Sequence, residues 1–209
     1  MMNEKFPKKI PIFPLRSAIF FPETNLPLNI FEPRYLKMIN KTLKGDSLLG
    51  MVQSKEIEGD VFQVGCLGKI SNHQKTEDGR ILINLYGLSR FKILKEINND
   101  QPFREFEVNY EDFRNDTIKN NSVNEILFEK LIKLSKKLFE KENMTLNWKE
   151  FSKLKMSQQI YTLIMISPFS VSEKQKLLEI PEINQIAETF NELTNFAFYE
   201  DPTKENAIQ

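Results

Sequence analysis

The chain has 209 residues, and its 29 Lys or Arg residues balance its 29 Asp or Glu residues, so the formal net charge is zero. A protein whose main partner is nucleic acid usually carries a basic excess, which this chain as a whole lacks. Its one cysteine, Cys66, excludes an internal disulfide and a cysteine-rich zinc site, and with one histidine, His73, transition-metal ligands are scarce. We therefore expect no metal or other cofactor, and a reducing compartment.

The N-terminal segment has no pattern typical of a signal peptide. Residues 1–9 are polar and basic, and the apolar run after them is interrupted by Pro11, Pro14 and Pro22. The longest helical apolar stretch, Ile160 to Ile166, is far shorter than the roughly 20 residues that a membrane span needs. The sequence therefore predicts a soluble, cytoplasmic protein without a membrane partner.

Two kinds of pattern divide the chain. Residues 10–112 hold glycines and strand-like alternation, whereas residues 120–200 hold no glycine and show helical periodicity. The polar seam at residues 111–116, continuing to Asn120-Asn121, is typical of a linker or surface loop. We expect a β-rich subdomain over residues 10–115 and a helical subdomain over residues 120–200.

The first part alternates like a set of short strands. The predicted strands are Ile10 to Leu15, Leu26 to Phe31, Leu48 to Gln53, Leu67 to Lys75, Arg80 to Phe91 and a last one through Phe106, Val108 and Tyr110. Because proline lacks the N–H that a central ladder requires, the first two should lie at sheet edges or start at their prolines. Asp78-Gly79 predicts a hairpin turn, Gly87 a bulge or bend, and Pro33 the start of a helix to about Leu43. Short strands with one helix indicate a compact, partly closed sheet.

The second part predicts four helices. The first carries a stripe of Val123, Leu127, Leu131, Leu134 and Leu138; the second spans Phe151 to Ile166; the third opens at a Ser170–Glu173 capping box and runs through Leu178; the fourth starts at Pro181 with Ile183, Ile186, Ala187, Phe190, Leu193 and Ala197 inward.

None of the motifs that carry chemistry is convincing. The segment Gly65 to Ile70 has two residues between its glycines, where a phosphate-binding P-loop has four, and is better explained as a strand. Ser152 and Lys155 could share a helix face, but the lysines around them favour a solvated surface. We expect His73 to face solvent and Cys66 to be a buried structural thiol. The chain therefore predicts no catalytic residues and no enzyme.

The stretch from Phe20 to Lys37 gathers aromatic residues, prolines and a Glu/Arg pair at a strand-to-helix junction. One interpretation is core packing with a helix cap. The other is an apolar groove that receives an extended peptide, because Arg and Tyr are common anchors of binding surfaces. The residues predicted to contact a peptide are Phe20, Phe21, Phe31, Glu32, Arg34, Tyr35 and Lys37.

Several motifs, in the same order, resemble the N-terminal substrate-binding domain of Lon proteases. They are Ile12-Phe-Pro-Leu15, Phe21-Pro22, Leu26-Pro-Leu28, Ile30-Phe-Glu-Pro-Arg-Tyr35, Asp78-Gly79, Gly87-Leu-Ser-Arg90-Phe91 and, in the tail, Ser172 to Leu178. The Phe-Glu-Pro-Arg-Tyr form looks most like stand-alone members, including the related region of cereblon. The resemblance implies an α+β fold, with a PUA-like, partly closed β-barrel head containing one main helix, followed by an α-helical bundle.

The resemblance also implies a function. In full-length Lon this region binds unfolded or degron-bearing proteins, while the ATPase and Ser–Lys peptidase domains come later, and this chain ends at Gln209. We therefore expect a non-catalytic module that binds unfolded proteins or peptides, with the recognition stretch at Glu32, Arg34, Tyr35 and Lys37. An adaptor role for a separate protease or chaperone, RNA binding, small-molecule binding and self-association stay open. The candidate RNA-binding clusters are Lys5, Lys8 and Lys9, and Lys149, Lys153 and Lys155.

Overall fold

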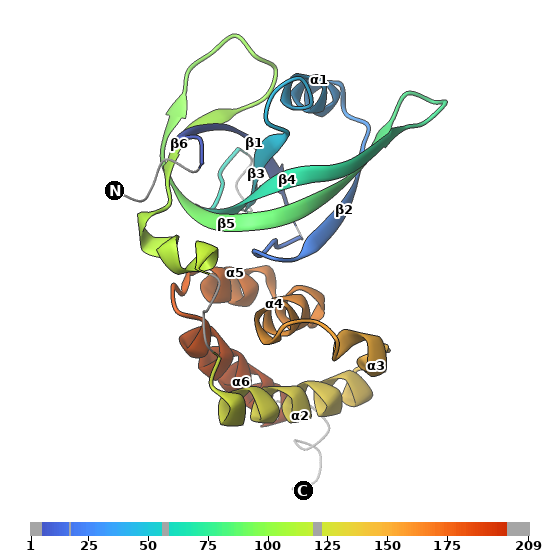
Figure 1. Cartoon of the computed structure of the whole chain (residues 1–209), viewed down its shortest axis with the longest axis vertical. Coiled ribbons are helices and arrows are strands. Elements are labelled where there is room, and N and C mark those ends of the chain that lie inside the picture. The colour runs from blue at the N-terminus through green and yellow to red at the C-terminus, as the bar shows by residue number, and fades with distance from the viewer. Residues whose placement is uncertain (1–5, 17, 56–58, 119–122, 200–209) are drawn as a thin grey trace, which may run out of the picture.

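The computed structural model describes residues 6–16, 18–55, 59–118 and 123–199. Figure 1 shows a β-rich part above a helical part, joined by the short 3₁₀ helix η1 (Glu111–Thr117). The strands are β1 Lys9–Leu15, β2 Asn25–Ile30, β3 Leu48–Gln53, β4 Val64–Lys75, β5 Ile81–Ile97 and β6 Glu105–Asn109. Helix α1 (Pro33–Thr42) lies over one end of the sheet.

The six strands form a partly closed sheet in the order β2-β5-β4-β3-β1-β6, and β6 pairs again with β5. The long strand β5 makes this closure possible. Its residues 81–86 pair with β2, its residues 92–97 pair with β6, and β4 lies along its other edge. The mixed α+β fold with a partly closed sheet is therefore confirmed.

The prolines have different consequences in the first two strands. Strand β2 has β5 as its one neighbour in the described part of the chain, so the prediction of an edge strand is confirmed there. The same prediction is wrong for β1, which lies between β3 and β6. Residues Lys9–Pro11 pair with β6, whereas Ile12–Leu15 pair in parallel with β3. Because the two neighbours cover different halves of β1, each proline has one side without a ladder partner.

The predicted hairpin and bulge are both confirmed. Strands β4 and β5 meet at Asp78-Gly79, where Gly79 has φ 87°. Leu67 pairs with Ser89 but Gly68 pairs with Gly87, so β5 has one extra residue at this point. Gly87 also lies against the segment before β2, and a Cβ there would overlap the carbonyl oxygen of Phe21. Any residue with a Cβ is therefore disfavoured at this position, because another segment of backbone approaches it closely.

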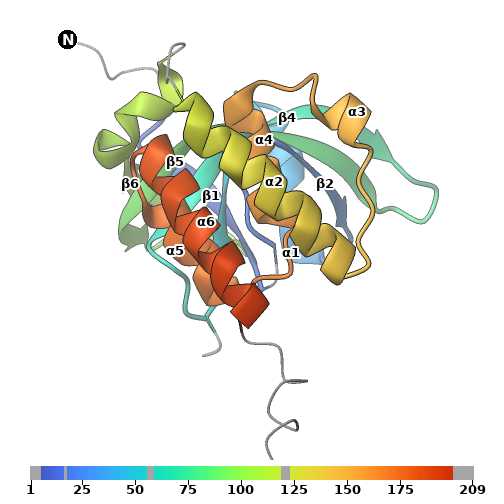
Figure 2. The same ribbon diagram turned by 90° about the horizontal axis from the view of Figure 1, so that it is seen from below.

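The helical part contains α2 Glu125–Lys141, α3 Trp148–Phe151, α4 Met156–Ile166, α5 Val171–Glu179 and α6 Ile183–Tyr199. Figure 2 shows α2 and α6 side by side. They run parallel, because the Asn124 N–H donates to Asn184 Oδ1 near their starts and Lys141 Nζ donates to the Ala197 carbonyl near their ends. No helix among the described residues is long and apolar enough to cross a membrane.

The single helix predicted from Phe151 to Ile166 is wrong at its start. Phe151 ends the short helix α3, which the Asn147 side chain caps, and the chain is extended again at Lys155 before α4 begins. The buried Phe151 packs edge-on against Trp148, so α3 follows its own core contacts and not the axis of α4. The capping box is confirmed, since Ser170 Oγ accepts from the Glu173 N–H and Glu173 accepts from the Ser170 N–H.

Apolar packing joins the two parts. The core of the helical part contains Leu131, Ile160, Leu163 and Phe190, and it also includes Ile19, Phe21 and Val64 from the β-rich part. Phe21 stacks on Tyr161 of α4 with ring centroids 5.0 Å apart.

The seam differs from the prediction of a linker or surface loop at residues 111–116. These residues form η1, where Phe113 is buried and the Asp116 side chain is fully buried. Asn120 and Asn121 lie outside the described residues. The polar seam is therefore part of the packed structure.

Candidate functional site

A hollow of about 400 Å³ opens on the β-rich part where α1 begins. We call it the α1 hollow. Its lining residues are Ile12, Pro14, Arg16, Glu32, Arg34, Tyr35, Ser54, Lys55, Gly59, Asp60, Val61, Pro102, Phe103 and Arg104. Three of the seven residues predicted to contact a peptide, Glu32, Arg34 and Tyr35, therefore meet in one concave surface.

The parallel pairing of β1 and β3 builds one rim of the α1 hollow. Leu15 pairs with Gln53, and the Ser54 N–H donates to the Leu15 carbonyl at 2.9 Å. Because the carboxyl ends of parallel strands lie at the same edge of a sheet, Arg16 and Lys55 follow their strands to the same rim. Residues that are far apart in the sequence thus contribute positive charges to the same hollow.

The start of α1 contributes Glu32, Arg34 and Tyr35 to the same hollow. Glu32 is extended, and Pro33 occupies the first turn, where its missing N–H costs nothing. Arg34 Nε donates to Glu32 Oε2 at 3.0 Å, and its guanidinium carbon lies 4.5 Å from the centre of the Tyr35 ring. Tyr35 is buried and packs edge-on against Phe13 with centroids 4.5 Å apart. Burial raises the pKa of Tyr35, so its hydroxyl stays neutral at physiological pH.

The charged groups of the α1 hollow are unequal in number. Among its described lining residues, four cations, Arg16, Arg34, Lys55 and Arg104, face two carboxylates, Glu32 and Asp60. Glu96, outside the lining, accepts from Arg104 Nε and Nη2 at 2.7 Å each, and these hydrogen bonds lower the pKa of Glu96. Arg16 and Lys55 make no ion pair within the described ranges of the chain. The described lining therefore carries more positive than negative groups.

The other four predicted residues lie elsewhere. Phe20 and Phe21 are fully buried in the core, so their predicted place in a peptide groove is corrected: strand closure and the contact with α4 cover them. Phe31, 63% exposed, and Lys37 are at the surface but do not line the hollow. No sequence pattern indicates the parallel pairing of β1 with β3, so the sequence alone did not predict Arg16, Lys55, Phe103 and Arg104 as site residues.

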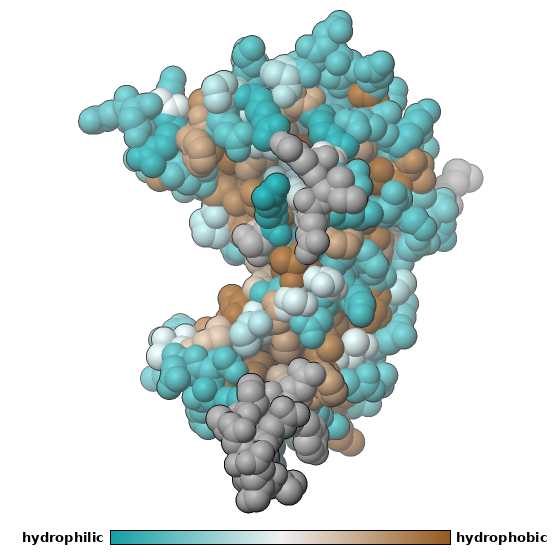
Figure 3. Space-filling model, turned by 180° about the vertical axis from the view of Figure 1, so that it is seen from behind, coloured by the Kyte–Doolittle hydropathy of each residue, from teal (hydrophilic) through white to brown (hydrophobic). Residues whose placement is uncertain are grey.

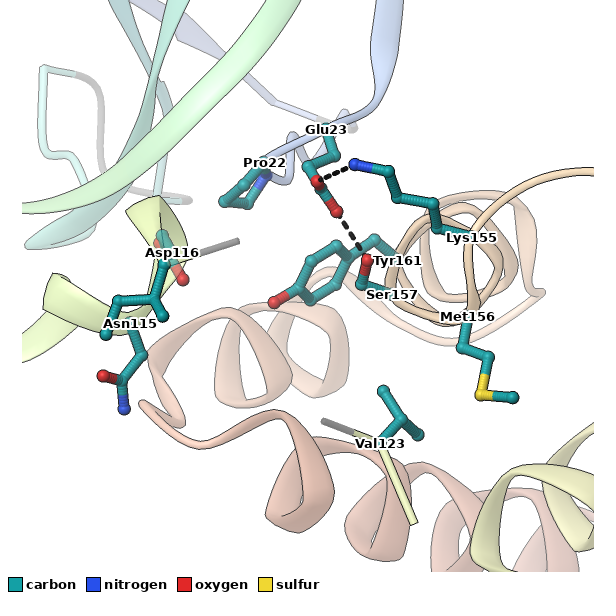
Figure 4. A pocket seen from close by; sticks show the side chains of 10 residues that line it. Pro22, Glu23, Asn115, Asp116, Val123, Lys155, Met156, Ser157 and Tyr161 are labelled. Atoms are coloured by element: carbon teal, nitrogen blue, oxygen red, sulfur yellow. Dashed lines mark hydrogen bonds and ion pairs between the residues drawn. The ribbon is translucent and has the colours of Figure 1, made fainter. Parts of the chain in front are cut away.

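A second hollow, of about 220 Å³, lies between the β-rich and helical parts (Figure 4). Glu23 reaches from the β-rich part to the start of α4, where its carboxylate accepts from Lys155 Nζ at 3.2 Å and from Ser157 Oγ. Gln158 Nε2 donates to the Glu23 carbonyl at 3.0 Å. Figure 3 shows the molecular outline hollowed between the two parts, with hydrophobic residues along it. These contacts hold the two parts together.

Ser152, Lys155, Cys66 and His73 do not form a reactive group. Ser152 Oγ donates to the Lys149 carbonyl at 3.0 Å, whereas Lys155 points to Glu23. Cys66 is fully buried in β4 and His73 is exposed, as the sequence predicts. Burial raises the pKa of the Cys66 thiol, which keeps it protonated. Within the described ranges, no group of three or more His, Cys, Asp or Glu side chains could hold a metal ion.

The candidate RNA-binding lysines are partly engaged. Lys153 Nζ lies 2.7 Å from Glu150 Oε1, and Lys155 pairs with Glu23. Lys8 and Lys9 are exposed near the N-terminus, and Lys5 lies outside the described residues. Nothing in these contacts favours RNA over a protein ligand.

The family model and the related sequences both point to the substrate-binding domain of Lon proteases. The family model for the ATP-dependent protease La (LON) substrate-binding domain matches residues 9–195. The Lon protease of Cytophaga hutchinsonii is 32% identical over 114 residues, which are 52% of this chain and 14% of that protein. The Lon protease of Buchnera aphidicola subsp. Acyrthosiphon pisum is 29% identical over 187 residues, which are 84% of this chain and 23% of that protein. The chain thus spans less than a quarter of these relatives.

Two solved structures share the fold. The Lon N-terminal domain protein from Xanthomonas campestris aligns with a TM-score of 0.63 at 19% identity, covering 86% of this chain and 95% of that one. The N-terminal domain of Mycobacterium avium complex Lon protease aligns with a TM-score of 0.62 at 13% identity, covering 90% and 98%. Since the family model matches nearly the whole described chain and the fold agrees, the chain belongs to the LON substrate-binding domain family.

Proposed function

We propose that this chain recognises protein segments and that the α1 hollow receives them. The observation that carries the proposal is the meeting of Arg34, Tyr35, Phe103 and two prolines in one hollow of about 400 Å³. Arginine and aromatic side chains dominate the energetics of protein interfaces. Membership of the LON substrate-binding domain family supports the same conclusion.

The α1 hollow is suited to binding because its main groups are already held in place. Tyr35 is fixed by Phe13, and Arg34 is held between Glu32 and the Tyr35 ring. Groups that are ordered before binding lose less conformational entropy when a ligand arrives. A short extended segment could lay an apolar side chain on Pro14 and Pro102, which Tyr35 and Phe103 support from the core, while Arg34 contacts its polar groups.

The test is fluorescence anisotropy with a labelled, permanently unfolded protein and with short peptides derived from it. Arg34→Ala is compared with Arg80→Ala, because both arginines are exposed and each pairs with a carboxylate two residues earlier. Arg80 lies at the β4–β5 hairpin turn, outside the α1 hollow.

We expect Arg34→Ala to weaken binding about fivefold or more, which corresponds to about 1 kcal/mol. Arg80→Ala should bind like the unchanged protein. Equal affinity of all three proteins for the segment, or no binding at all by a folded sample, would overturn the proposal.

A further inference from the structure

We propose that the α1 hollow selects segments that present a carboxylate next to an apolar residue. This inference rests on the proposed function and adds the chemistry of the ligand. Its basis is that Arg16 and Lys55, two cations without a carboxylate partner among the described residues, line the same hollow as the apolar residues Pro14 and Pro102.

Two cations of the α1 hollow make no ion pair among the described residues. Arg16 and Lys55 are both exposed. Arg16 directly follows Leu15, which pairs with Gln53, and Lys55 directly follows Ser54, whose N–H donates to the Leu15 carbonyl. Lys55 Nζ lies 5.6 Å from the centre of the Phe62 ring, and this cation–π contact is the one interaction of its ammonium group in the described part of the chain. Their charges are thus available to an incoming anion.

The carboxylates around the α1 hollow are mostly paired with arginines other than Arg16. Glu32 is paired with Arg34, and Glu96 is paired with Arg104, whose Nη1 also donates to the Gly59 carbonyl at 2.6 Å. Asp60 is the one lining carboxylate that makes no ion pair within the described ranges. Among the described lining residues, four cations face two carboxylates, so cations outnumber carboxylates by two in this part of the chain.

The lining of the α1 hollow also contains proline and aromatic residues. Pro14, Tyr35, Pro102 and Phe103 line the hollow beside these charges, and Phe103 and Tyr35 are buried parts of the core under α1. Pro14 and Pro102 keep accessible surface, so an apolar side chain placed on them leaves water, while a neighbouring carboxylate can reach Arg16 and Lys55. A cationic group at the same place would meet net repulsion.

The carboxylate can come from two sources, the free C-terminus of an unfolded chain or an Asp or Glu side chain. Four versions of one labelled apolar peptide separate them. The first ends in a free carboxylate, the second in an amide, the third is amidated with an internal Glu, and the fourth is amidated with Gln in place of that Glu. Binding is measured by anisotropy at low and high salt.

We expect the carboxylate-bearing peptides to bind about threefold to tenfold more tightly than their amide or Gln counterparts, with the difference shrinking at high salt. Preference for the first peptide alone identifies the C-terminus as the source, preference for the third alone identifies the side chain, and preference for both identifies any carboxylate. Equal binding of all four overturns the inference.

Single substitutions test whether Arg16 and Lys55 cause the preference for carboxylate-bearing peptides. Arg16→Gln and Lys55→Gln should each reduce the preference while leaving the amidated peptide's affinity nearly unchanged, and Lys75→Gln, an exposed lysine at the far end of β4, should leave the preference intact. If Arg34→Ala weakens all four peptides equally and no carboxylate preference exists, the proposed function stands and this inference falls. If Arg34→Ala weakens none of them, the proposed function itself fails.

Discussion

Arg90 and Asp116 form an ion pair in which both side chains are fully buried, with Arg90 Nη2 2.7 Å from Asp116 Oδ1. Asp116 also accepts from the backbone N–H of Arg90 at 2.8 Å. The guanidinium lies 4.6 Å from the Phe113 ring. It donates further hydrogen bonds to the carbonyl oxygens of Leu178, Ile180 and Pro181. One side chain of β5 therefore joins η1 to the end of α5 and the approach to α6.

A second polar link of opposite sign lies at the start of α4. There the carboxylate of Glu23 contacts Lys155 and Ser157. The C-terminal end of a helix carries partial negative charge and its N-terminal end partial positive charge. Arg90 at the end of α5 and Glu23 at the start of α4 thus both match the helix end that they meet, and together they fix the helical part against the β-rich part.

The first prediction concerns Asp116→Asn. Removing one partner of a buried ion pair leaves the other charge uncompensated, so the free energy of unfolding should fall by about 3–5 kcal/mol. Asp112→Asn is the control, because Asp112 lies in the same 3₁₀ helix but pairs with Lys92 at 3.9 Å, with both side chains about half exposed. Urea denaturation followed by circular dichroism measures both. A loss for Asp116→Asn as small as that for Asp112→Asn, about 0.5 kcal/mol or less, would contradict the prediction.

Local patterns predicted the local elements of this fold. The Asp78-Gly79 turn, the Gly87 bulge and the Ser170–Glu173 capping box each depend on residues within a few positions, and all three are present. The polarity of residues 111–116 suggested a surface loop, and that prediction is wrong. The burial of Asp116 depends on Arg90, 26 residues earlier, and no short window of sequence contains both residues.

The candidate site was predicted only in part for the same physical reason. Glu32, Arg34 and Tyr35 are adjacent in the sequence, so their shared location could be expected. Arg16 and Lys55 line the same hollow because β1 and β3 pair in parallel, with β2 and α1 between them in the chain. The prolines of β1 suggested an edge strand, which concealed this pairing. The two cations that carry the proposed ligand preference were therefore invisible to the sequence patterns.

The second prediction compares Glu23→Gly with Glu23→Ala. Both variants lose the carboxylate contacts with α4, but Glu23 has φ 58°, a left-handed conformation that costs a residue with a side chain about 1–2 kcal/mol. The glycine variant should therefore be the more stable of the two by about 1 kcal/mol. At Glu129, an exposed position inside α2, the order should reverse, because glycine weakens a helix by about 1 kcal/mol relative to alanine. Thermal or urea unfolding that ranks alanine above glycine at position 23 would contradict the prediction.

The third prediction concerns the backbone contact at Gly87. A Cβ there would overlap the Phe21 carbonyl, while the Glu23 N–H and the Gly87 carbonyl share a hydrogen bond of 2.9 Å that resists movement. Gly87→Ala should lower the free energy of unfolding by about 2 kcal/mol or more. At Gly45 an added Cβ meets only the Thr42 carbonyl at 3.8 Å, so Gly45→Ala should change stability by less than about 1 kcal/mol. Equal effects at the two positions would argue against the close approach.

The fourth prediction concerns the reactivity of Cys66. The thiol is fully buried, and burial, with a smaller contribution from Asp116, raises its pKa. Since the thiolate is the nucleophile, a maleimide should label the folded protein at pH 7 far more slowly than the urea-unfolded protein. Mass spectrometry of timed samples measures the rates, and equal labelling of folded and unfolded protein would contradict the burial. Labelling of Asp116→Asn should be faster, because that variant opens more often.

The last prediction concerns pH. Two hydrogen bonds from Arg104 lower the pKa of Glu96 in the folded protein, so this ion pair stabilises the fold above the unfolded pKa of about 4.3 and the contribution disappears as the pH falls through the folded pKa. Glu96→Gln should therefore be less stable than the unchanged protein at pH 6 and nearly equal to it near pH 3. Because both side chains are partly exposed, at 32% and 46%, the difference at pH 6 should not exceed about 1 kcal/mol. Urea denaturation at several pH values measures it, with Glu77→Gln, an exposed carboxylate of the hairpin turn, as the control that should show no such trend. A Glu96→Gln deficit that persists unchanged down to pH 3 would mean that charge pairing with Arg104 is not its cause.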